Sequence, residues 1–122
     1  MVVGLMEYLI SPVAKPRMTK RDTWLKRPAT SKYWAFKDEV RLLGIKVPLC
    51  GAHITFHMPM PNSWSRAKRE KMVCRPHQVK PDADNLVKAL FDALYENDAG
   101  IWDFRVTKVW SDKGKIEVKC GG

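Results

Sequence analysis

Apolar and polar residues alternate in several stretches of the chain, and each such stretch predicts a β-strand. The clearest is GAHITFHM, residues 51–58, in which every second side chain from Ala52 onward is apolar. The alternation in 101–110 predicts another strand. SDKG then predicts a turn, after which 115–120 return as a further strand. Residues 2–10, at the start of the chain, predict one more.

A helical spacing of apolar residues appears between these strands. In residues 84–95, Leu86, Leu90 and Leu94 form one apolar stripe, and Val87 and Phe91 widen it. This spacing predicts a helix over these residues. A second helix is expected from Thr30 or Ser31, with Ser31 as its cap and Gly44 at its end. SRAKREKM, residues 65–72, predicts a short third helix. The order of these elements predicts one α+β domain over residues 1–122, with two main helices packed on a mixed sheet.

Charge is distributed unevenly along the chain. Residues 1–80 hold 16 Lys/Arg and 5 Asp/Glu, a balance of +11, while residues 81–122 hold 6 and 8, a balance of −2. A basic body with a separate acidic region suits a protein that holds a polyanion and carries out metal chemistry on it. Solubility alone is the alternative explanation of the charge. The apolar runs are too short for a membrane span, and three scattered cysteines favour a reducing cytoplasm.

The acidic region centres on KPDADNLVKALFDAL, residues 80–94. In an extended lead-in to the helix, the side chains of Asp82 and Asp84 point the same way and offer the hard oxygen ligands that Mg²⁺ or Mn²⁺ prefers. Asp98, the third candidate, follows the helix. A helix of about eleven residues is about 16 Å long, so Asp98 joins the other two only if its loop folds back or a symmetry-related chain supplies it.

Each of these residues also has a structural interpretation. Asp84 is a favourable helix cap and lies close to the positive end of the helix. Lys88 is four residues further on, so it either forms an ordinary ion pair with Asp84 or stabilises charge on a reacting phosphate. A zinc site at Cys74 and His77 lacks a second pair of ligands. Trp64, in a basic segment, is the tryptophan best suited to stack on a base.

The central stretch resembles the signature of the RusA family of Holliday junction resolvases, in which a basic residue, Pro, Asp-x-Asp-Asn-Leu-x-Lys and a final Asp-Ala-Leu follow in this order. SPVAKPRMTK upstream and NDAGIWDFRVTKVW downstream are similar to flanking segments of the family, so the resemblance spans about residues 8–119. Two positions near the third acid, Asn97 and Gly100, depart from the family pattern. Asp103 is therefore an alternative to Asp98.

The resemblance implies a homodimeric, Mg²⁺-dependent endonuclease, with Mn²⁺ as a substitute, that nicks four-way DNA junctions symmetrically inside a bacterial or phage-infected cell. It assigns Asp82, Asp84 and Asp98 as essential metal-binding acids and Lys88 as the catalytic lysine. The residues expected to bind DNA phosphates are basic and lie on both sides of the first helix: Lys15, Arg17, Lys20, Arg66, Lys68, Arg69 and Lys80. Two alternatives stay open, a nuclease for other branched DNA such as flaps, and a non-catalytic DNA-binding protein.

Overall fold

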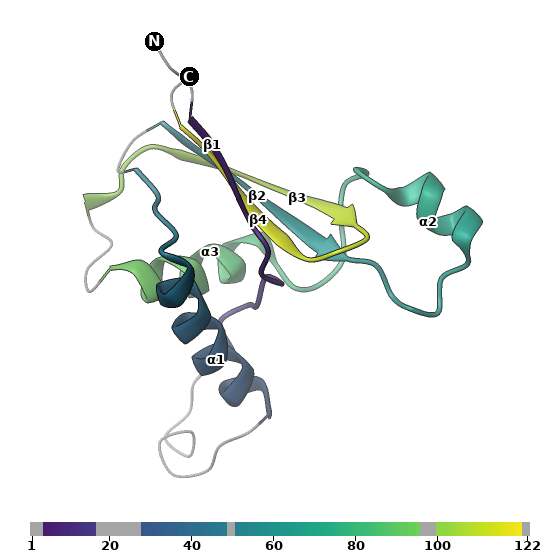
Figure 1. Ribbon diagram of the computed structural model, residues 1–122, viewed down its shortest axis with the longest axis horizontal. Helices are drawn as coiled ribbons and strands as arrows, with labels where there is room; N and C mark the ends of the chain where they lie inside the picture. Colours follow the sequence, from purple (N-terminus) through teal and green to yellow (C-terminus); the bar gives the residue numbers. More distant parts are fainter. Residues whose placement is uncertain (1–3, 17–27, 49–50, 96–99, 121–122) are drawn as a thin grey trace.

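The strands and helices follow the order expected from the sequence. The computed structural model describes residues 4–16, 28–48, 51–95 and 100–120 (Figure 1). Its strands are β1 (Gly4–Tyr8), β2 (Ala52–Pro59), β3 (Phe104–Ser111) and β4 (Lys115–Cys120). Its helices are α1 (Pro28–Leu43), α2 (Arg66–Met72) and α3 (Ala83–Leu94). The predicted α+β class, with a mixed sheet and helices packed on it, is confirmed.

The order of strands across the sheet differs from the order along the chain. The sheet runs β1-β4-β2-β3, with β2 parallel to β3 and β4 antiparallel to both β1 and β2. The predicted turn at SDKG does reverse the chain, but β4 does not return beside β3, because β2 lies between them. Most of β2 is buried, including Thr55 on the face away from the helices. β2 is therefore an interior strand, with β4 on one edge and β3 on the other.

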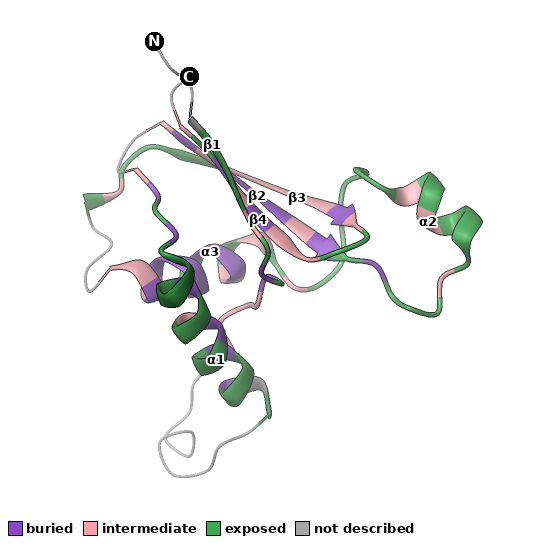
Figure 2. Ribbon diagram, viewed as in Figure 1, coloured by how far each residue is buried: buried purple, intermediate pink, exposed green. Residues whose placement is uncertain are grey.

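Helices α1 and α3 cover one face of the sheet and close the hydrophobic core (Figure 2). The stripe of α3 is buried as predicted except for Leu94, which is half-buried, and Leu86 and Leu90 are fully enclosed. The sheet contributes side chains that alternate toward the helices, namely Ile54, Phe56, Ile116 and Val118. Helix α1 contributes Tyr33, Phe36 and Val40. Burial of these residues, at about 25 cal/mol per Å² of apolar surface, is the main force that fixes α3 against the sheet.

The boundaries of α1 differ from the prediction at its start. The helix begins at Pro28, so Ser31 lies within the first turns rather than at the cap. Proline is well suited to the first position of a helix, because its missing N–H would have no partner there. The end agrees with the prediction, since Gly44 has a φ of +65° just after Leu43.

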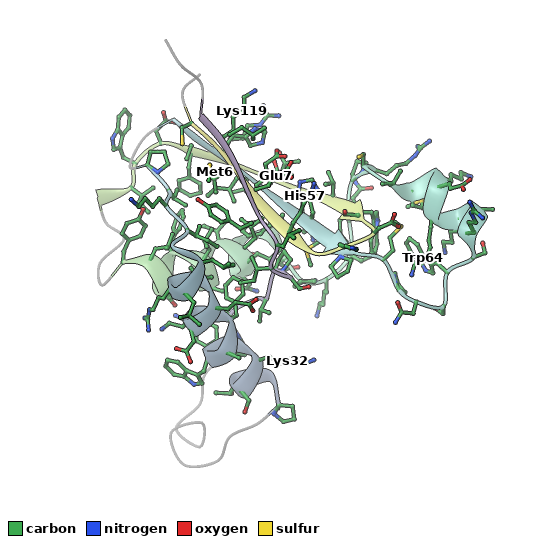
Figure 3. The ribbon with its side chains drawn as sticks, in the orientation of Figure 1. Met6, Glu7, Lys32, His57, Trp64 and Lys119 are labelled. Atoms are coloured by element: carbon green, nitrogen blue, oxygen red, sulfur yellow. The ribbon has the colours of Figure 1, made fainter. Side chains whose placement is uncertain are left out.

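The opposite face of the sheet is polar. Cross-strand neighbours there are His53 with Lys119, Thr55 with Glu117, and His57 with Lys115. The Lys115 ammonium lies 3.5 Å from the Glu7 carboxylate on β1. Figure 3 labels Glu7, His57 and Lys119 along this part of the sheet. The two faces therefore differ in chemistry, and Asp82 and Asp84, at the start of α3, belong to the helix-covered side.

Residues 61–80 form an arm that stands beyond the ends of β2 and β3, away from α1 (Figure 1). The arm carries α2, the predicted short helix, which is capped by Ser65 and has no buried residue. The returning limb of the arm lies along β3. The Cys74 N–H donates to the Trp110 carbonyl at 2.9 Å, and the Trp110 N–H donates to the Arg75 carbonyl at 3.0 Å. This pairing attaches the arm to the edge of the sheet.

Candidate active site

Asp82 and Asp84 lie together at the start of α3, and both are exposed. Asp82 occupies the N-cap position, with extended backbone angles, but its side chain makes no capping hydrogen bond. Asp84 lies inside the first helical turn, so it is not the cap that the structural interpretation required. A carboxylate near the positive end of a helix is stabilised there. Both carboxylates are therefore free to bind a ligand from solution.

Lys88 is the third predicted residue that the structure brings to this place. Its Nζ lies 3.9 Å from Asp84 Oδ2, one helical turn away. Both side chains are more than half exposed, 60% and 69%, so the pair contributes little to stability. The lysine can therefore turn toward a bound phosphate at little cost in stability.

The third acid is not placed beside these residues by the described part of the chain. Asp98 lies outside the described residues. Asp103 immediately precedes β3, where its carbonyl accepts a hydrogen bond from the Gly51 N–H at 3.0 Å. Among the described residues, no group of three His, Cys, Asp or Glu side chains is close enough to hold a metal ion. Asp103 therefore does not complete a site with Asp82 and Asp84 within one chain.

Lys108 holds the segment that leads into the acidic pair, and sequence reasoning did not single it out. Its Nζ donates to the Val79 carbonyl at 2.7 Å and to the Pro81 carbonyl at 2.5 Å. Partial burial lowers the pKa of Lys108, and the nearby Asp82 carboxylate acts in the opposite direction. The available signal was a charged residue on the apolar face of a strand, between Val106 and Trp110.

A second basic residue, Lys15, borders the site from the segment after β1. Its N–H donates to the Asn85 carbonyl at 3.0 Å, and its Nζ lies 2.7 Å from Asp92 Oδ2. The same oxygen accepts the Tyr33 hydroxyl at 2.8 Å. Burial raises the pKa of Asp92, but the hydrogen bonds from Lys15 and Tyr33 outweigh it, and the pKa lies below its usual value. A hollow of about 420 Å³ lies between Lys15, Pro16, Asn85 and Lys88.

The arm carries most of the remaining residues predicted to bind DNA. Arg66 is 94% exposed and pairs with Glu70 at 3.3 Å, and Lys68 is also exposed. Arg69 is more engaged, because it donates to the Pro61 carbonyl at 2.9 Å and lies 3.5 Å from Asp112. Lys80 is exposed just before Pro81. The other two predicted contacts, Arg17 and Lys20, lie outside the described residues.

Trp64 has a structural role at the base of the arm. Its ring packs on Trp110 with 4.7 Å between centroids, and the Lys68 ammonium lies 4.2 Å above it (Figure 3). His77 packs on the same Trp110 ring at 4.2 Å. Cys74 and His77 belong to no cluster of three possible metal ligands among the described residues.

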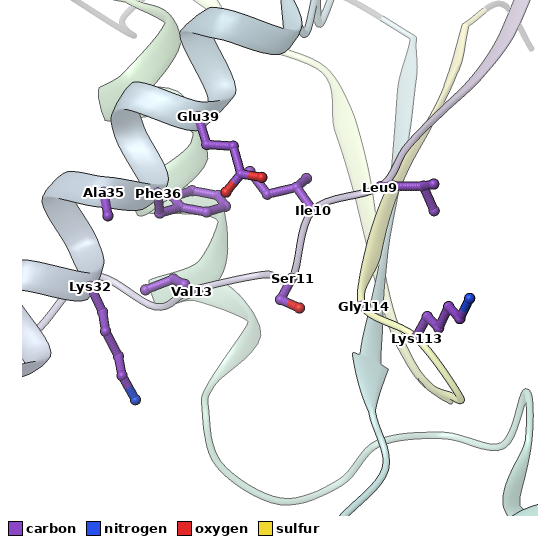
Figure 4. Close-up of a pocket in the computed structure, with 10 residues that line it drawn as sticks. All are labelled: Leu9, Ile10, Ser11, Val13, Lys32, Ala35, Phe36, Glu39, Lys113 and Gly114. Atoms are coloured by element: carbon purple, nitrogen blue, oxygen red, sulfur yellow. The ribbon is translucent and has the colours of Figure 1, made fainter.

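Two further hollows on the molecule are larger than the one beside Lys15. One of about 580 Å³ lies between the segment after β1, α1 and the turn before β4 (Figure 4). Glu39 is its single acidic residue, and Lys32 and Lys113 flank it. A groove of about 480 Å³ runs from Asp84 and Lys88 along the apolar side of α3 toward β3. Of these hollows, the groove and the smaller cavity next to Lys15 adjoin the acidic pair.

A small mixed sheet with an exposed acidic pair and a lysine at the start of one helix, next to basic surfaces, is an arrangement suited to a protein that acts on DNA. None of the described helices is long and apolar enough to cross a membrane. Residues 10–120 match the family model described as Endodeoxyribonuclease RusA. The chain therefore belongs to the RusA family of endodeoxyribonucleases, as its resemblance implied.

One curated relative is also similar over most of its length. It is YqaN of Bacillus subtilis (strain 168), described as an uncharacterized protein, and it is 35% identical over 128 aligned positions. These positions cover 88% of this chain and 87% of the relative. The two chains therefore share the whole domain rather than a short motif.

Proposed function

We propose that this protein is a Mg²⁺-dependent endonuclease that resolves four-way DNA junctions by paired, symmetric nicks. One observation carries the proposal. In a member of an endodeoxyribonuclease family, Asp82 and Asp84 are exposed together at the start of α3 with Lys88 one turn away, and Asp82 caps nothing. If the only role of Asp82 were to begin the helix, its side chain would make the capping hydrogen bond.

The residues present fit a divalent cation. Asp82 and Asp84 offer carboxylate oxygens, and the Asp82 side chain makes no capping hydrogen bond. Carboxylate oxygens are the donors that Mg²⁺ prefers, and Mn²⁺ accepts the same donors. Asp98 is proposed as the third ligand on the strength of its match to the family pattern. When bound, Mg²⁺ would activate a water molecule and polarise the phosphodiester for in-line attack, leaving a 5′ phosphate and a 3′ hydroxyl.

The chain's own residues would hold and orient the DNA. Lys88, weakly paired at 3.9 Å, would exchange Asp84 for the scissile phosphate and offset the negative charge that develops there. Lys15, with Asn85 beside the same hollow, would bind an adjacent phosphate. Arg66, Lys68 and further basic residues of the arm would hold a DNA arm through its backbone, with binding that does not depend on base sequence.

Two cuts related by symmetry require two active sites. A homodimer with a two-fold axis would present two copies of the acidic pair to a junction that has an approximate two-fold axis of its own. The partner could also supply the third acid that the described part of one chain does not place beside Asp82. The predicted homodimer is therefore part of the proposal.

The proposal is tested with purified protein on end-labelled DNA. The substrates are a four-way junction, a three-way flap, a fork and a linear duplex of matched sequence, each with Mg²⁺ and with EDTA. Paired symmetric nicks in the junction, only with Mg²⁺, are expected. Equal cutting of flaps would move the assignment to a broader nuclease of branched DNA. Tight junction binding without any cut would contradict the enzymatic proposal and favour a DNA-binding protein.

A further inference from the structure

Lys108 is a charged residue on the face of β3 that is turned toward the helices. Its cross-strand neighbour on β2 is Phe56, which is fully buried in the core. A lysine in such a position must either pair its ammonium or extend it to solvent. The Lys108 ammonium is paired, and both carbonyls that accept its hydrogen bonds lie in the segment that precedes the acidic residues.

Lys108 holds this segment at three points. Its ammonium donates to the Val79 and Pro81 carbonyls, at 2.7 and 2.5 Å. Its own carbonyl accepts the His77 N–H at 3.0 Å. Residues 77–81 are therefore fixed against β3 from both the side chain and the backbone of one residue. The second of these carbonyls belongs to the residue next to Asp82.

The position of Asp82 depends on this segment because its own side chain supplies no anchor. The Asp82 carboxylate makes no capping bond, while its carbonyl accepts the N–H groups of Asn85 and Leu86, both at 3.2 Å. The backbone of Asp82 is thus held on one side by α3 and on the other by the contacts of Lys108. Loss of the second set would leave the carboxylate free to rotate with its backbone.

We infer that Lys108 is a positioning residue, which holds the 79–81 segment so that the carboxylates of Asp82 and Asp84 face one cation. This inference rests on the proposed function of the acidic pair. Lys108 does not itself contact the substrate, and Lys88 remains the lysine that acts on the phosphate. Groups that orient metal ligands from behind affect metal affinity or activity by about 10- to 100-fold.

The test compares Lys108→Met with wild type. Methionine keeps the length of the side chain and loses the donors. Lys115→Met is the matched control, because Lys115 also lies on the sheet in an ion pair, with Glu7, but on the opposite face. Lys108→Arg retains charge and donors, and Lys108→Gln replaces the methionine variant if that variant does not fold. Thermal unfolding checks each variant.

Three readouts are measured: hydrogen exchange of the amides in residues 83–86, Mn²⁺ affinity of the free protein by electron paramagnetic resonance, and the rate of junction cleavage. In Lys108→Met, exchange is expected to be faster, Mn²⁺ binding about tenfold weaker, and cleavage about 10- to 100-fold slower. Junction binding in Ca²⁺ is expected to stay within about threefold of wild type. Lys108→Arg should recover part of each loss, and Lys115→Met should show none.

The direction of the change in metal affinity separates positioning from a simple effect of charge. A lysine ammonium repels a cation, so if Lys108 acted through charge alone, its removal would tighten Mn²⁺ binding. Tighter binding, or unchanged exchange and affinity in Lys108→Met, would overturn the inference. If wild type cuts no branched DNA, the proposed function fails, and hydrogen exchange still tests whether Lys108 holds the segment.

Discussion

Three aspartates on one helix have different surroundings. Asp82 and Asp84 are exposed at its start, and the Asp82 side chain caps nothing. Asp92, two turns further on, accepts both Lys15 and Tyr33. The same replacement, Asp to Asn, therefore compares a carboxylate that is proposed to serve chemistry with one that is expected to serve stability.

Asp84→Asn is expected to bind junction DNA about as well as wild type and to leave it uncut, because the amide keeps the shape of the side chain and loses the charge that holds a cation. The free energy of unfolding should change by less than about 0.5 kcal/mol, as is usual for an exposed side chain. Gel-shift titration in Ca²⁺, cleavage in Mg²⁺ and urea unfolding measure the three quantities. Loss of DNA binding would mean that Asp84 is structural.

Asp92→Asn is the matched control and is expected to do the reverse. It weakens a charged hydrogen bond with Lys15 and the bond from Tyr33, so the free energy of unfolding should fall by about 1–2 kcal/mol. Junction cleavage at a temperature well below the unfolding midpoint should persist. If Asp92→Asn abolished cleavage while the fold stayed intact, Lys15 and its carboxylate partner would belong to the reaction.

The His77 ring gives the stability of the protein a dependence on pH. Its ring is buried against Trp110, and its Nδ1 has no hydrogen-bond partner. Burial, and then the charge of Lys108, lower its pKa below the usual 6.5. As pH falls below 6.5, the unfolded chain takes up the proton first, so stability decreases toward acid. Stability from this source is complete above that pH.

His77→Phe, which keeps the packing on Trp110, should therefore lose less stability than wild type between pH 7.5 and 5.5. Urea unfolding at the two pH values measures the difference. Some dependence should remain, because burial also lowers the pKa of His57. An equal loss in variant and wild type would show that His77 is not protonated differently in the two states.

At the scale of elements, the sequence pattern predicted the individual helices and strands better than it predicted which strands pair. The apolar stripe of α3 and the alternation of β2 are local properties, and the structure has both elements within one or two residues of their predicted ends. The neighbour of β4 is a long-range property. The short SDKG turn favoured β3, but β2 lies between β3 and β4 in the sheet. A short connection therefore did not determine which strands pair.

The candidate site was predictable in part for the same reason. Asp82, Asp84 and Lys88 lie within seven consecutive residues, so one helix start brings them together whatever the rest of the fold does. Lys108 acts through a contact that spans 27 residues, and only the register of β3 places it under Pro81. Residue spacing holds no information on such a contact. A lysine on an apolar strand face was its only trace in the sequence.

The charged side chains of α2, in the arm, lie outside the hydrophobic core. None of the residues of α2 is buried, so replacing Arg66 and Lys68 together by Gln should leave the free energy of unfolding within about 0.5 kcal/mol of wild type. Junction affinity should fall, and the dependence of log affinity on log salt should become shallower by about one per lost phosphate contact. Titrations at several salt concentrations measure this slope.

The matched control is Lys115→Gln on the polar face of the sheet, which removes a charge away from the arm. It should leave the salt slope unchanged. An unchanged slope in the α2 variant would place DNA elsewhere, on the hollow beside Lys15 and Lys88. An equal decrease in both would mean that net charge, rather than the arm, governs binding.

At the scale of the whole molecule, the proposed activity requires that one small domain make two cuts. The described part of one chain holds one acidic pair and, among its residues, no complete cluster of three metal ligands. A symmetric dimer would supply two sites and bring a second chain close to each. Mixing wild type with Asp84→Asn subunits tests this, since the inactive subunit is expected to retain DNA binding.

The substrate for this test is a supercoiled plasmid with an extruded cruciform, on which two opposed nicks give a linear product and one nick gives a relaxed circle. Wild-type dimers should give linear DNA. After an equal mixture has exchanged subunits, about half of the dimers should carry one active site, and relaxed circles should accumulate at the expense of linear product. If the mixture gave only linear DNA, at half the wild-type rate, both cuts would come from one chain or from independent dimers. If it gave only linear DNA at about a quarter of the wild-type rate, the product would come from the remaining wild-type dimers alone, and each cut would need Asp84 from both chains.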